Sequence, residues 1–99
     1  MTLALHREAE ADILEAFRWY ESKQLGLGNA FVAEVDEALA RLVEGPSSFA
    51  VVYREMRRLV LRRFPYVIYF RQSESVVQVL GVLHGRRHRR RLRQRTAEP

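Results

Sequence analysis

Three basic residues, Arg58, His84 and Arg87, are of types that can cleave a phosphodiester bond. Cleavage of RNA without a metal needs a group that deprotonates the attacking 2′-hydroxyl, one that stabilises the charged intermediate and one that protonates the leaving 5′-oxygen. Histidine titrates near neutral pH and can exchange a proton, whereas arginine keeps its proton and supplies only charge. These residues are a candidate catalytic set if the fold brings them together.

A wider set could bind a target or a protein partner: Arg58, Arg62, Tyr66, His84, Arg86 and Arg87. Arginine suits contacts with phosphates and carboxylates. Simpler interpretations exist, because exposed arginines are often only solvated and a histidine at a strand end often makes structural hydrogen bonds. Tyrosines that alternate with apolar residues often pack across strands. The sequence therefore leaves both interpretations open.

The composition excludes several kinds of site and location. The 99 residues are enough for one domain, and the absence of cysteine excludes disulfides and thiolate metal sites. The three histidines lack a metal-ligand spacing with carboxylates, so we expect no metal and no cofactor. The sequence has no signal-peptide pattern and no apolar run of about 20 residues. We therefore expect a cytoplasmic protein that does not contact membranes.

Charge is unevenly divided between the two halves of the chain. Residues 1–50 carry four basic and nine acidic side chains, and residues 51–99 carry thirteen basic and three acidic ones, giving net charges of −5 and +10. The second half indicates an anionic partner: nucleic acid, an enzyme that acts on nucleic acid, or an acidic protein segment. Arginine serving only as a solubilising residue is the alternative.

Apolar residues at helical spacing predict two helices in the first half. The first helix begins near residue 8 and ends near residue 24, and its apolar face consists of Ala9, Ile13, Ala16, Phe17 and Tyr20. The second ends at Gly45-Pro46, and its apolar face consists of Phe31, Val35, Ala38, Leu39 and Leu42. With only a short connection around Gly26, the two helices should form an antiparallel hairpin.

Short apolar or alternating runs predict strands on both sides of this hairpin. They lie at residues 3–6, 49–56, 57–64, 66–71 and 76–83. In the run 57–64 the alternation places Leu59 and Leu61 on one face and Arg58 and Arg62 on the other. The last run is apolar on both faces, so we expect it to be the central strand.

These elements predict an α+β fold of order β-α-α-β-β-β, in which the run 49–56 is a possible fourth strand after the helices. The N-terminal strand and helical hairpin should pack on a mainly antiparallel sheet of three to five strands, giving a two-layer sandwich. Its open face should carry Arg58, Arg62 and tyrosines. We assign residues 1–88 to one domain and 89–99 to an Arg-rich C-terminal tail, which has too few apolar residues to add much core.

Several strings, in this order and spacing, resemble the RelE/ParE superfamily of toxins from type II toxin–antitoxin systems. They are residues 8–16, 19–21 and 26–31 in the hairpin, Phe64-Pro65-Tyr66 in the middle strands, and residues 79–87 at the basic end. The resemblance implies a two-layer fold and a growth inhibitor that a cognate antitoxin neutralises. ParE-branch toxins poison DNA gyrase, whereas RelE-branch toxins cut mRNA on the ribosome.

The chain departs from the RelE-branch pattern where cleavage depends on it. Tyr66 stands in place of a middle-strand arginine, and the late tyrosine and the catalytic lysines of that branch are absent. We therefore predict a ParE-like toxin of the plasmid-stabilisation type, which binds DNA gyrase and blocks replication without being an enzyme. No residue is assigned a catalytic role on this interpretation.

Two alternatives stay open. A RelE-like, metal-independent endoribonuclease would use Arg58, His84 and Arg87. A non-toxic accessory protein would bind only an antitoxin or DNA. All three interpretations expect a cognate antitoxin that covers the open sheet face or the hairpin in a toxin–antitoxin hetero-oligomer, with nucleic acid as a further candidate contact.

Overall fold

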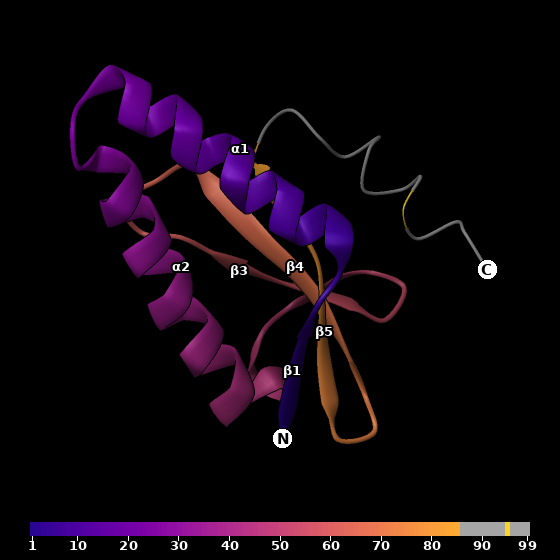
Figure 1. The fold of residues 1–99 in the computed structure, drawn as a ribbon. Coiled ribbons are helices and arrows are strands. Elements are labelled where there is room, and N and C mark those ends of the chain that lie inside the picture. The colour runs from indigo at the N-terminus through magenta and orange to yellow at the C-terminus, as the bar shows by residue number, and fades with distance from the viewer. Residues whose placement is uncertain (86–94, 96–99) are drawn as a thin grey trace.

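Five strands and two long helices follow one another along the chain (Figure 1). They are β1 (Thr2–Leu5), α1 (Arg7–Lys23), α2 (Leu27–Glu44), the short 3-10 helix η1 (Pro46–Ser48), β2 (Val51–Tyr53), β3 (Met56–Val60), β4 (Tyr66–Ser73) and β5 (Val76–His84). This computed structural model describes residues 1–85 and Arg95. Within them, no helix is both long and apolar enough to cross a bilayer.

The strands form one mixed sheet in the order β1-β5-β4-β3-β2. Neighbours from β2 to β5 are antiparallel, as short connections require, whereas β1 runs parallel to β5 because the helical hairpin lies between them in the chain. The α+β fold class is therefore confirmed. β5 has a neighbouring strand on each side, as its apolar residues on both faces indicate, but the middle strand of the five is β4 and not β5.

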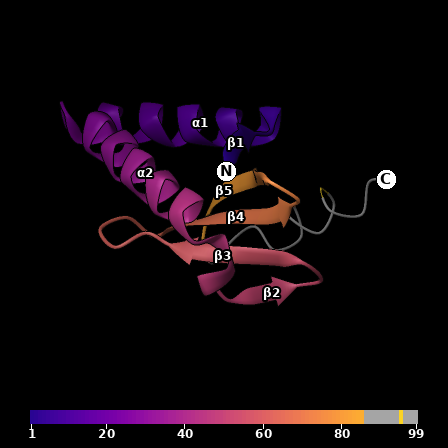
Figure 2. The ribbon, with the colours of Figure 1, turned by 90° about the horizontal axis from the view of Figure 1, so that it is seen from below.

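Both helices lie on the same side of the sheet (Figure 2). The main core fills the space between these layers, and its largest fully buried side chains are Phe31, Phe70, Leu42, Ile68, Val35, Val77, Val79 and Val82. Burial of each such side chain stabilises the fold by about 1.5–3 kcal/mol. These residues come from α2, β4 and β5, so the hairpin and the inner strands hold each other in place.

The connection between the helices is held by one carboxylate. Glu21 accepts hydrogen bonds from the N–H groups of Gly26 and Gly28, at 2.8 and 2.9 Å. The first turn of a helix leaves N–H groups without partners inside the helix, and Glu21 satisfies that of Gly28 in α2 together with that of Gly26 just before it. Gly26 has a φ of 87°, a left-handed conformation that glycine adopts without strain.

The bounds of all five predicted strands shift in the structure, and those of two strands shift most. Met56 belongs to β3 and not to the strand before it, and β3 ends at Val60 and not at Phe64. Arg62 therefore lies in the β3–β4 loop, and the prediction that it shares a sheet face with Arg58 is wrong. The reason is that the N–H of Arg62 donates to the Glu34 carboxylate of α2 and so leaves the strand ladder.

The sheet face away from the helices is more apolar than predicted. Its buried cluster consists of Met56, Val67, Tyr69, Leu80 and Leu83, with Tyr53 packed against it. Arg58 lies on this face, since it pairs across the strands with Tyr69. Tyr69 and Tyr53 are the tyrosines of this face, whereas Tyr66 packs against the main core.

Candidate functional site

His84 and Tyr66 lie side by side at the end of the sheet, beneath α1. They are register partners on β5 and β4, and their ring centroids are 5.6 Å apart at 73°. Both line a notch of about 30 Å³ together with residues of α1 and β5, including Asp12 and Glu15. That volume suits a water molecule and not a nucleotide.

Arg58 is on the opposite face of the sheet from His84. Arg58 pairs with Tyr69, whose side chain belongs to the cluster away from the helices, whereas His84 contacts Tyr66 on the helix side. Groups that share one proton-transfer reaction must reach the same scissile bond. The structure therefore does not bring Arg58 and His84 together.

Arg62 lies in a loop that α2 positions. Glu34 accepts hydrogen bonds from the backbone N–H of Arg62 at 2.6 Å and of Arg63 at 3.2 Å. Arg62 and Arg63 line a cavity of about 220 Å³ together with residues of α2 that include Arg41. The side chains of both loop arginines are exposed, so this end of the molecule presents cationic groups to solvent.

The pKa of the Glu34 carboxyl is lowered by its hydrogen bonds with this loop. Burial raises its pKa, but the hydrogen bonds from Arg63 and Arg62 together outweigh burial, and the pKa lies below its ordinary value. The carboxylate is therefore charged at neutral pH while it holds the loop.

The remaining predicted site residues, Arg86 and Arg87, lie outside the described residues. Among the residues that are described, no group of three histidine, aspartate or glutamate side chains is placed to hold a metal ion. The described part of the predicted surface is thus Arg58 on one sheet face, Arg62 in the loop, and Tyr66 with His84 in the notch.

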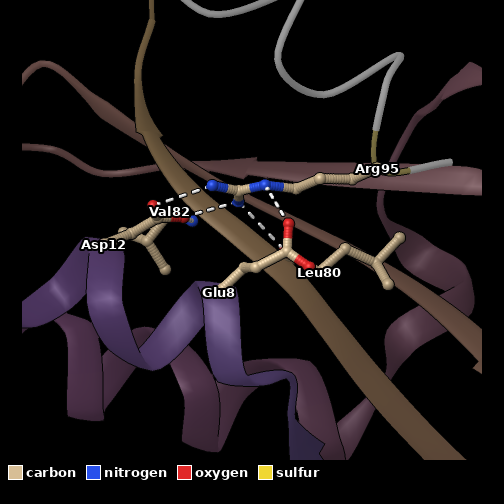
Figure 3. Close-up of polar contacts among 5 residues, drawn as sticks. All are labelled: Glu8, Asp12, Leu80, Val82 and Arg95. Atoms are coloured by element: carbon tan, nitrogen blue, oxygen red, sulfur yellow. Dashed lines mark hydrogen bonds and ion pairs between the residues drawn. The ribbon is translucent and has the colours of Figure 1, made fainter.

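Sequence reasoning missed a polar cluster between α1 and β5 (Figure 3). The guanidinium of Arg95 donates to both carboxylate oxygens of Asp12, at 2.7 and 3.0 Å, and its Nε lies 2.9 Å from Glu8 Oε2. Asp12 also accepts a hydrogen bond from the N–H of Val82 at 3.0 Å. Asp12 is the one buried charged residue of the described core.

A signal for Asp12 is present in the sequence. It is three residues after Ala9 and four before Ala16, so it interrupts the apolar face of the first helix. A carboxylate on a buried face needs a cationic or N–H partner. No comparable signal identifies Arg95, which is one of seven arginines in the segment 84–95.

A family model, two relatives and a solved structure resemble this chain, and all of them indicate the same family. The family model described as the ParE toxin of the type II toxin–antitoxin system parDE matches residues 3–89. The proteins named Toxin ParE2 from two Mycobacterium tuberculosis strains, CDC 1551 / Oshkosh and H37Rv, are each 29% identical over 84 residues, which is 84% of this chain and 80% of theirs.

A solved structure described as the chromosomal ParDE TA system from P. aeruginosa has a similar fold. Its TM-score is 0.75 at 24% identity, with 85% of this chain and 95% of that chain covered. The matched family region spans both long helices and the five strands, except for Thr2 at the start of β1. The chain belongs to the ParE toxin family of type II toxin–antitoxin systems.

Proposed function

We propose that this ParE toxin inhibits growth by binding DNA gyrase and blocking replication. The observation that carries the proposal is the separation of Arg58 and His84 by the thickness of the sheet. A ribonuclease that used both would need them on one side. A toxin that binds a protein target needs only an exposed, complementary surface.

We place the target-binding surface on the basic second half of the chain. Arg58 and Arg62 are exposed in the structure, and Arg86 and Arg87 follow β5 in the sequence. Cationic groups attract an acidic protein surface or DNA held by the target, mainly by raising the rate of association. In this proposal residues 1–88 form the toxin domain and 89–99 an Arg-rich tail.

A parDE toxin has a cognate antitoxin, and we propose that it binds the sheet face away from the helices. That face combines an apolar cluster with exposed Arg58 and Arg71 at its margin. An amphipathic, acidic antitoxin segment would match both features. Tyr66 and His84 lie on the helix side at the end of the sheet, so they form a second, separate candidate contact surface of this toxin–antitoxin hetero-oligomer.

The proposal can be tested with purified gyrase and supercoiled product as the readout. We expect the toxin to inhibit supercoiling, and we expect Arg58→Ala together with Arg62→Ala to raise the half-inhibitory concentration about tenfold or more. Arg18→Ala is the matched control, because it removes an exposed arginine from α1. Unaltered supercoiling at saturating folded toxin would contradict the proposal.

A further inference from the structure

The edge of β5 is covered by β1 over only part of its length. β1 pairs with residues 76–79, and the N–H of His6 donates to the carbonyl of Val79 at 3.0 Å. The chain then enters α1 at Arg7, so β1 offers no partner from Leu80 onward. Exposed strand edges present N–H and C=O groups that need other partners or admit another strand.

Side chains supply these partners at the point where β1 ends. The N–H of Val82 donates to Asp12, and the carbonyl of Leu80 accepts a hydrogen bond from Arg95 Nη1 at 3.2 Å. Leu80 is also the additional residue of a bulge. Phe70 pairs with Val79, but Tyr69, just before it in β4, pairs with Gly81, so Leu80 has no partner in β4. At the bulge, the Leu80 carbonyl lies close enough to Asp12 for one guanidinium to donate hydrogen bonds to both groups.

The guanidinium fits because Gly81 has no side chain. A Cβ on Gly81 would lie 2.6 Å from Arg95 Nη1, closer than real Cβ contacts, but 3.4 Å from Asp12 Oδ2. Gly81 does not have a positive φ, so its backbone would accept alanine without strain. An alanine here would therefore displace the arginine and leave the carboxylate in place.

The arrangement is suited to arginine and not to lysine. A planar guanidinium has five N–H donors and reaches two carboxylates and a carbonyl at once, whereas an ammonium is a compact group with three donors. The side chains of Arg95 and Asp12 are only 11% and 7% exposed, unlike the solvated ion pairs that contribute little to stability.

We propose that the free edge of β5 contains an arginine-binding site whose ligand is the chain's own Arg95. The site consists of Glu8, Asp12, Gly81 and the carbonyl of Leu80. Arg95 and Asp12 satisfy the Leu80 carbonyl and the Val82 N–H on the edge that β1 leaves uncovered, and the Arg95 guanidinium joins this edge to α1 through Asp12 and Glu8. The site does not depend on which cellular target the toxin has.

The test measures thermal unfolding of the full chain in four variants. We expect Arg95→Ala and Gly81→Ala each to lower Tm by about 5 °C or more, because each removes the same guanidinium from the site. The double variant should be no less stable than Arg95→Ala alone, since the two changes act on one interaction. Arg93→Ala, which removes the same charge nearby in the sequence, should leave Tm within about 2 °C.

Chemical rescue distinguishes the site from general stabilisation. N-acetyl-arginine amide at millimolar concentration should raise the Tm of Arg95→Ala, and N-acetyl-lysine amide should not. The side-chain Nε–H resonance of Arg95, assigned by its loss in Arg95→Lys, should move to the position of solvated arginines in Gly81→Ala. Additive losses of Tm in the double variant, or equal losses for Arg93→Ala and Arg95→Ala, would overturn the proposal.

Discussion

Glu34 shows how one side chain fixes the position of a loop 28 residues away. Its side chain is only 10% exposed, and its carboxylate accepts hydrogen bonds from two backbone N–H groups. Its ion pair with the Arg63 side chain is less important, because that side chain is 69% exposed and solvent screens it. The backbone bonds therefore account for most of the interaction.

Replacement of this carboxylate should change how the stability of the fold depends on pH. The pKa of Glu34 is lowered in the folded state, so its contribution is fully present above the unfolded pKa, near 4.5, and is lost as pH falls through the lower folded pKa. Glutamine keeps one acceptor oxygen but loses the charge, so we expect Glu34→Gln to cost about 1 kcal/mol at pH 7 and progressively less below pH 4.5. Urea unfolding across this pH range measures the difference.

Arg63→Ala is the control for that prediction. It removes the exposed side-chain ion pair but keeps the N–H that donates to Glu34, so it should cost about 0.5 kcal/mol or less. A cost as large as that of Glu34→Gln would show that the side-chain pair, and not the backbone bonds, holds the loop.

His84 gives a second prediction at the residue scale. Since its ring lies on the helix side and Arg58 on the other, His84→Gln should leave growth inhibition by the induced toxin within about twofold of wild type, as expected of a residue outside the target surface. Induction at matched protein levels and colony counting would measure this. Loss of inhibition by a folded His84→Gln protein would favour an acid–base role.

At the scale of elements, the approach of the two helices depends on Gly28. A Cβ at this position would lie 2.7 Å from the backbone oxygen of Phe17 and 2.9 Å from a carboxylate oxygen of Glu21. The backbone oxygen cannot move without shifting α1, so the clash is not relieved by a side-chain rotation. Gly28 therefore sets the separation of α1 and α2.

We expect Gly28→Ala to destabilise the fold by about 1–3 kcal/mol, as overpacking does in well-packed interiors. Gly26→Ala is the comparison, because a Cβ there meets no atom within 4 Å and costs only the left-handed φ, about 1–2 kcal/mol. Chemical denaturation compares the two variants. Wild-type stability in Gly28→Ala would contradict the assigned contact.

The elements also show what could be predicted from the sequence. Helical spacing and the Gly45-Pro46 signal identified both helices, because those patterns are local. The length of β3 could not be predicted, since it is set by Glu34, far away in the sequence. The candidate site was predicted as residue types but not as an arrangement, because the face on which Arg58 lies depends on strand register.

At the scale of the whole molecule, acidic and basic residues are separated between the two halves of the chain, but the sheet contains strands from both halves. The acidic first half forms the helices and β1, and the basic second half forms the rest of the sheet and the C-terminal segment. The parallel pairing of β1 with β5 joins the two halves in one sheet. The order of elements predicted the layers but not this pairing, which places β1 beside the last strand of the chain.

This charge distribution predicts a salt-dependent encounter with the target. We expect the association rate of toxin and gyrase to fall about tenfold or more between low and physiological ionic strength, while the dissociation rate changes little. Stopped-flow or surface-based kinetics would measure both rates. A salt-independent association rate would contradict a role for the basic half in steering.

The most direct test of the central claim is brief induction of the chain without its antitoxin in a bacterial host, with chromosome breaks and mRNA cleavage scored in the same cells. The account predicts gyrase-linked double-strand breaks while mRNA stays intact. Rapid mRNA cleavage with intact chromosomes would contradict it and favour a ribonuclease, and no growth inhibition by folded, antitoxin-free protein would contradict it in favour of an accessory role.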